Sequence, residues 1–99
     1  MKADITFRYT KLGINYDTNL VKTLLVSINQ HLLSIYLHLE NNPNFLETGK
    51  IYTGTVDFYT LEPENYAEAF QGNLTEYKTV IIEGKNIVGE AHLQNLRQQ

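Results

Sequence analysis

The hydrophobic pattern near the N-terminus alternates strictly between apolar and polar side chains. In DITFRYT, residues 4–10, the apolar side chains of Ile5, Phe7 and Tyr9 are separated by single polar residues. A period of two places all three on one face, which is typical of a strand with one buried side. We therefore expect a strand over residues 4–10.

The stretch LVKTLLVSINQHLLSIYLHLE, residues 20–40, is the longest apolar segment of the chain. Asp17 or Thr18 precedes it as a candidate helix cap, and Pro43 follows it at a position where a helix cannot continue. Stepping about 100° per residue gathers a broad apolar face on one side. We predict a helix over residues 18–40 that packs on a sheet through this face, with Val21, Leu25, Ile28, Leu32 and Ile35 in the core.

The predicted helix carries a second apolar stripe on its opposite side, formed by Val26, Leu33 and Leu37. The loop that contains Phe45 and Leu46, a second copy of the chain, or a different protein could cover this stripe. Most soluble oligomers are symmetric homo-oligomers, and one helical stripe can pack against its own copy. We therefore predict a homodimer with Val26, Leu33 and Leu37 as the self-association contact.

The middle of the chain predicts one strand and one short helix. Residues 50–61, KIYTGTVDFYTL, have the alternation of a strand, and Gly54 within it indicates a bulge or a close backbone approach. Pro63 suits the first turn of a helix and Gly72 its end, so a short helix is expected between them.

The C-terminal part predicts a hairpin. Residues 77–83 and 86–93 flank Gly84-Lys85, and Gly at the first central position suits a type II′ turn. Residues 94–99 are polar and are expected to fray or to add a last helical turn.

The order of elements predicts a single α+β domain over residues 1–99. It has the order β-α-β-α-β-β, with a largely antiparallel sheet of about four strands, one long helix packed on a face, and one short helix.

Composition excludes several classes of protein. The chain is 42% hydrophobic and 19% charged, which is typical of a globular domain, and it contains no cysteine. A disulfide framework, a thiolate metal site and a thiol nucleophile are therefore excluded. Asp4 and Arg8 interrupt the stretch that a signal peptide would need to be apolar, and no charge-free apolar window is long enough to span a membrane. We expect a cytoplasmic protein without membrane contact.

Acidic residues are concentrated in the middle of the chain. Residues 40–76 contain seven acidic residues and one lysine, whereas the flanking segments are slightly basic. A one-sided acidic surface can steer a basic partner toward it, although it can equally serve to keep a small acidic protein soluble. No basic stripe is present, so direct nucleic-acid binding is not expected. Acidic and tyrosine side chains together form the predicted partner-binding set: Asp57, Tyr59, Glu62, Glu64, Tyr66 and Glu68.

The histidines do not indicate a catalytic or metal site. His31 and His38 lie seven residues apart, too far along a helix to share a metal ion, and His92 is expected on the outward face of the last strand. No nucleophile elbow or phosphate-binding loop is present. We expect no catalytic residues, no metal ligands and no cofactor.

These observations predict a small, non-catalytic protein-interaction module. It would act as an inhibitor that blocks a basic site on a partner such as a nucleic-acid-handling enzyme. The alternative is a small-molecule-binding protein or small enzyme with a tyrosine-lined pocket between the helix and the sheet.

Overall fold

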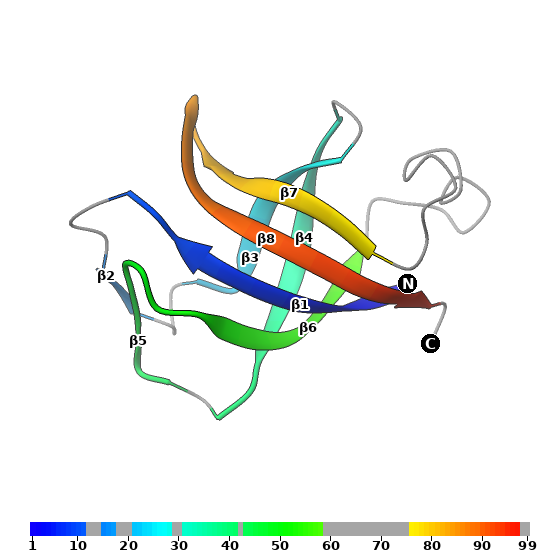
Figure 1. The fold of residues 1–99 in the computed structure, drawn as a ribbon, viewed down its shortest axis with the longest axis horizontal. Helices are drawn as coiled ribbons and strands as arrows, with labels where there is room; N and C mark the ends of the chain where they lie inside the picture. The colour runs from blue at the N-terminus through cyan, green and yellow to red at the C-terminus, as the bar shows by residue number, and fades with distance from the viewer. Residues whose placement is uncertain (12–14, 18–20, 29–30, 42, 59–75, 98–99) are drawn as a thin grey trace.

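The structure is a computed structural model of the chain, and it describes residues 1–11, 15–17, 21–28, 31–41, 43–58 and 76–97. Every regular element in these residues is a β-strand (Figure 1). The strands are β1 (Lys2–Tyr9), β2 (Asn15–Asp17), β3 (Thr23–Ile28), β4 (His31–Leu39), β5 (Phe45–Glu47), β6 (Tyr52–Phe58), β7 (Glu76–Glu83) and β8 (Asn86–Arg97).

Six of these strands form a closed antiparallel barrel in the order β1-β6-β4-β3-β7-β8, in which β8 pairs again with β1. Between β3 and β7 the barrel closes, in the described residues, through one paired position, Val26 opposite Ile81. The two short strands β2 and β5 form a separate two-stranded sheet, which lies at one end of the barrel in Figure 1.

The predicted α+β fold is therefore wrong: the described residues contain no helix, and the sheet is a closed barrel of six strands. In this part of the chain no helix is long and apolar enough to cross a membrane. The predicted short helix after Pro63 lies outside the described residues.

The segment predicted as the long helix is instead the hairpin of β3 and β4. The two strands pair from Thr23 opposite Tyr36 to Ile28 opposite His31. Within β3, Leu24, Val26 and Ile28 point into the barrel and alternate with more exposed residues, and β4 shows the same period from Ser34 onward. Leucine-rich sequence fits a helix and a strand alike, and pairing with neighbouring strands decides between them. Asp17, expected as a helix cap, belongs to β2 and pairs with Phe45.

The barrel interior is filled with side chains that alternate along the strands, as expected for a small barrel. From β1 it receives Ala3, Ile5, Phe7 and Tyr9, which confirms the predicted N-terminal strand and its buried face. The Phe7 ring packs against those of Tyr9 and Tyr52, with ring centres 6.1 Å and 5.7 Å away.

The predicted core of residues 18–40 is partly wrong. Ile28 and Ile35 are buried, as expected, but Leu25 is only half-buried and Leu32 is 57% exposed. Conversely, Val26 and Leu37, expected on an outward stripe, are 0% and 8% exposed and belong to the core. A strand separates inward from outward residues with a period of two, and a helix does not, so the two assignments must differ.

Two local features of the predicted strands are confirmed. β7 and β8 form the expected antiparallel hairpin, with Glu83 opposite Asn86 and a positive φ of 63° at Gly84. Gly54 lies within β6, where an added Cβ would collide with the carbonyl oxygen of His38 on β4. The glycine therefore marks a close backbone approach, one of the two alternatives expected from the sequence.

Strand β8 continues to Arg97, so residues 94–97 belong to the strand and do not fray. Gln94 lies opposite Asp4 and Arg97 opposite Lys2, with a register shift between the two pairs. Asn95, at a φ of 55°, occupies this irregularity. Its side-chain amide donates a 2.8 Å hydrogen bond to Asp4, and Arg97 lies 3.1 Å from the same carboxylate. Asp4 thus fastens the last strand to the first.

Candidate binding site on the outer face of the barrel

Of the six residues predicted to bind a partner, only Asp57 lies in the part of the chain that the structure describes. Its carboxylate is 2.9 Å from Nε2 of His38 on the neighbouring strand β4, and the Asp57 side chain is 19% exposed. Asp57 therefore has a partner within the barrel. Tyr59, Glu62, Glu64, Tyr66 and Glu68 lie outside the described residues.

The three residues predicted for self-association do not form one surface. Val26 and Leu37 lie in the barrel core, and Leu33 is a half-buried residue packed against it. The outward stripe followed from the predicted helical geometry. Because these residues form strands, they do not make such a stripe. A homodimer remains a prediction, to be tested by light scattering.

The predicted tyrosine-lined pocket between helix and sheet has no counterpart in the described residues, since these contain no helix. Tyr9 and Tyr52 instead pack inside the barrel. The Tyr52 hydroxyl accepts a 2.8 Å hydrogen bond from the amide of Glu47 and donates one of 3.2 Å to the carbonyl of Phe45. It thereby attaches β5 to the barrel wall.

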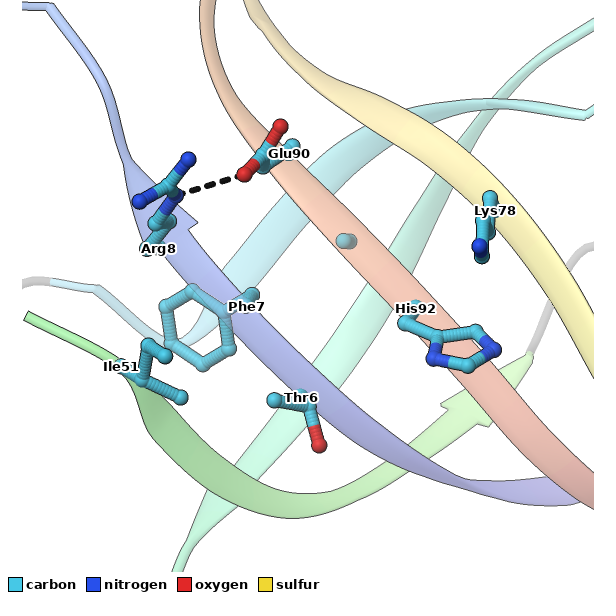
Figure 2. A pocket seen from close by; sticks show the side chains of 8 residues that line it. Thr6, Phe7, Arg8, Ile51, Lys78, Glu90 and His92 are labelled. Atoms are coloured by element: carbon cyan, nitrogen blue, oxygen red, sulfur yellow. Dashed lines mark hydrogen bonds and ion pairs between the residues drawn. The ribbon is translucent and has the colours of Figure 1, made fainter. Parts of the chain in front are cut away.

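The structure contains a different concavity, on the outer face where β1, β8 and β7 lie side by side (Figure 2). We call it the outer-face depression. It has a volume of about 360 Å³ and is open to solvent. Its lining consists of Thr6, Phe7, Arg8, Ile51, Lys78, Glu90, Ala91 and His92.

Strand register places three polar side chains of the depression in one row. Thr6 of β1 lies opposite His92 of β8, and His92 lies opposite Lys78 of β7. Directly opposed residues of antiparallel strands have their Cβ atoms about 5 Å apart. Thr6, His92 and Lys78 therefore follow one another across three strands, and we call them the donor row.

The neighbouring row is closed by an ion pair. Arg8 lies opposite Glu90, and its Nε donates a 2.5 Å hydrogen bond to the glutamate Oε1 (Figure 2). Both side chains are about half exposed, at 46% and 55%, so the pair adds little to stability. Its effect on the site is to neutralise two charges and to form one wall of the depression.

The donor row, in contrast, has unused hydrogen-bonding capacity. Among the described residues, neither the Thr6 hydroxyl nor the Lys78 ammonium group has a hydrogen bond or an ion pair. Nε2 of His92 is shielded from solvent and makes no hydrogen bond. The carboxylate oxygen Oε2 of Glu76 lies 3.4 Å from this nitrogen. The Thr6 hydroxyl and the Lys78 ammonium group thus remain available to a ligand, whereas Nε2 of His92 is not accessible from solvent.

Ile51 provides an apolar margin to the same depression. It lies just before β6, and 63% of its surface is exposed. A depression with a few placed polar groups beside apolar surface has the composition expected of a binding site. The described residues do not include three histidine, aspartate or glutamate side chains gathered closely enough to hold a metal ion.

Comparison of the chain with protein-family models, with curated proteins and with solved structures finds no match. The function must therefore be inferred from the geometry of the molecule itself.

Proposed function

We propose that the chain is a small, non-catalytic module that binds another protein through the outer face of β1, β7 and β8. The observation that carries this proposal is the outer-face depression, in which the Thr6 hydroxyl and the Lys78 ammonium group, without hydrogen-bonding partners among the described residues, lie near an exposed isoleucine.

The tight packing of the barrel interior supports the proposal that the outer surface binds the partner. Phe7, Ile35, Val56 and Leu93 come from four different strands, and each is at most 2% exposed. A core packed in this way is a source of stability and leaves recognition to side chains on the outside. Closure of the barrel also pairs β8 with β1 along its outer face, so that this face offers a partner side chains and not a free backbone edge.

The openness of the depression favours a protein over a small molecule. Small-molecule sites usually bury 70–90% or more of their ligand, which a depression open to solvent on a sheet face is less suited to do. Protein interfaces, by contrast, concentrate affinity in a few side chains that become desolvated in pockets of the partner and are ringed by energetically neutral contacts. Ile51 and the Arg8–Glu90 pair are suited to such a ring.

A second contact of the same module is proposed from charge. The chain has 8 basic and 11 acidic residues, and three of the acidic ones are Glu62, Glu64 and Glu68, so the remainder is balanced. This distribution supports docking of residues 59–75 near a basic region of the partner, which is how an inhibitor of a basic site would act.

The test is site-specific photo-crosslinking in extracts of the source cells. A photoreactive residue at Ile51 is compared with the same residue at Leu32, which is similarly exposed but does not line the depression. We expect one specific crosslinked protein from position 51 and none from position 32. No product from position 51, or the same products from both positions, would refute the proposal.

A further inference from the structure

We infer that the outer-face depression is a receptor for one carboxylate side chain, an aspartate or glutamate of the partner, held by Thr6 and Lys78 at the two ends of the donor row. The inference rests on the proposed function in assigning the carboxylate to a protein. The binding chemistry itself can be measured on the isolated module.

The geometry of the donor row suits a small planar acceptor. Neighbouring strands of a sheet lie about 4.8 Å apart, so the three residues extend over about 10 Å across the sheet. They come from β1, β8 and β7, and Figure 2 shows the side chains of Thr6, Lys78 and His92 around the depression. A carboxylate has two oxygens with about four lone-pair directions and can accept from several donors at once.

The charges around the row favour a single negative charge on the ligand. Lys78 is a cation without an ion pair among the described residues, whereas Arg8 is already neutralised by Glu90. The Glu76 carboxylate would repel a bound anion, because its Oε2 lies 3.4 Å from His92 Nε2. Glu76 is not a member of the donor row, however: it lies two residues before Lys78 on β7, opposite Gln94. One available cation beside a flanking carboxylate matches a carboxylate better than a doubly charged phosphate group.

The volume and the apolar margin of the depression are suited to an acidic side chain that belongs to a polypeptide. Its volume of about 360 Å³ accommodates one side chain with its immediate neighbours. Ile51 offers apolar surface at the margin, so an apolar residue next to the acidic one would be buried on docking. The charge-assisted hydrogen bond from Lys78 is the strongest of the contacts available.

The experiment is an NMR titration of the isotopically labelled module with N-acetylglutamate N-methylamide. The control probe is N-acetylglutamine N-methylamide, which has the same shape without the charge. Affinity for one side chain is weak, on the order of a few millimolar. We expect the acidic probe to shift the backbone amide signals of Thr6, Lys78 and His92, and the neutral probe to leave them in place.

Matched variants separate this site from general attraction to lysines. Lys78→Met should weaken binding of the acidic probe at least about tenfold, whereas Lys85→Met, at the exposed hairpin turn, should leave it unchanged. The amide spectra of both variants report whether the barrel is intact. Equal shifts with both probes, equal losses in both variants, or shifts confined to other residues would overturn the inference.

The two proposals fail in distinguishable ways. Crosslinking from position 51 without any response of the donor row to the acidic probe would preserve the module and refute the carboxylate site. A response of the donor row without crosslinking would preserve the carboxylate site and refute its assignment to a protein partner.

Discussion

Gly54 shows how a single missing side chain allows two strands to meet. It lies opposite Ile5 of β1 and Leu39 of β4, and a Cβ at this position would meet the His38 carbonyl oxygen. A backbone atom cannot move aside as the end of a flexible side chain can. The substitution must therefore push β4 and β6 apart.

We predict that Gly54→Ala lowers the free energy of unfolding by about 1–3 kcal/mol, the range for overpacking. Urea denaturation measures the change. The neighbouring Thr55→Ala, on the outward face of the same strand, should change the same quantity by less than about 1 kcal/mol. Equal effects would show that the close approach of β4 and β6 does not exist.

Among the described residues, Asp4 is one whose ionisation is coupled to the fold. The hydrogen bond from Asn95, together with the Arg97 guanidinium, holds the pKa of the Asp4 carboxyl below its ordinary value of 3.8. A carboxyl with a depressed pKa in the folded state contributes stability above that ordinary value and loses it as the pH falls through the folded-state pKa.

We therefore predict that Asp4→Asn is less stable than the native chain at pH 7 by roughly 0.2–1 kcal/mol, since the Asp4 side chain is 43% exposed and solvent screens its ion pair. The difference should shrink below about pH 4 and vanish at lower pH, because both chains are then uncharged at this position. Urea denaturation at pH 7 and at pH 2.5 measures it. A difference that does not change with pH would mean that the charge of Asp4 does not fasten β8 to β1.

The donor row shows the limit of sequence reasoning at the scale of residues. A two-residue turn at Gly84-Lys85 sets Glu83 opposite Asn86, and continuing that register would place Lys78 opposite Ala91. A shift of one residue between Ile81 and Ile82 brings Lys78 opposite His92 instead. A slip of one residue reverses which side chains share a face, so the row depends on an irregularity that the sequence did not reveal.

At the scale of elements, the strands with strict alternation could be predicted and the leucine-rich segment could not. Residues 4–10, 50–61 and the hairpin at Gly84 each show a strong pattern, and the corresponding strands are present. The segment from Leu20 to Glu40 has so many apolar residues that both periods fit it. In the structure the burial of residues 23–28 and 34–39 alternates, but Leu25 occupies an outward position of the first strand and hides this alternation in the sequence.

Two substitutions in this segment distinguish the hairpin from the predicted helix. Ile35 is fully buried in the barrel, and we predict that Ile35→Ala destabilises the protein by about 2–5 kcal/mol. Leu32 is 57% exposed, so Leu32→Ala should change stability by no more than about 0.5 kcal/mol. The helix would bury both residues on one face. Comparable losses from the two substitutions in thermal or urea unfolding would contradict the hairpin.

At the scale of the whole molecule, closure of the barrel depends on pairs between distant segments. β1 pairs with β6 and β8, so residues more than 80 positions apart, such as Arg8 and Glu90, come into contact. Local patterns predict which segments form strands, but they do not specify which non-consecutive strands pair. For this reason the sequence predicted that His92 faces outward, but it did not predict which residues of the neighbouring strands lie beside it.

The acidic residues of the chain provide a test of docking on a basic partner. We predict that the triple substitution of Glu62, Glu64 and Glu68 by Gln slows association with the crosslinked partner and weakens its salt dependence, since long-range attraction governs the encounter rate. Stopped-flow or surface-plasmon measurements provide the rates. The matched control replaces Glu40, Glu47 and Glu83 by Gln, which changes the net charge equally.

If both triple variants slow association to the same extent, only the net charge matters, and residues 59–75 are not a docking contact. If neither variant slows it, the acidic residues serve solubility. Local docking predicts a clear loss in the first triple variant and little change in the second.

The central claim is that the chain closes into a barrel whose register brings Thr6, His92 and Lys78 side by side. Nuclear Overhauser contacts between backbone protons, measured on the labelled protein in solution, test it most directly. The barrel predicts cross-strand contacts from Thr6 to His92, from His92 to Lys78, and from Leu25 to Ser34. Contacts between residues three positions apart throughout residues 23–39, or pairing of Lys78 with Ala91 in place of His92, would contradict it.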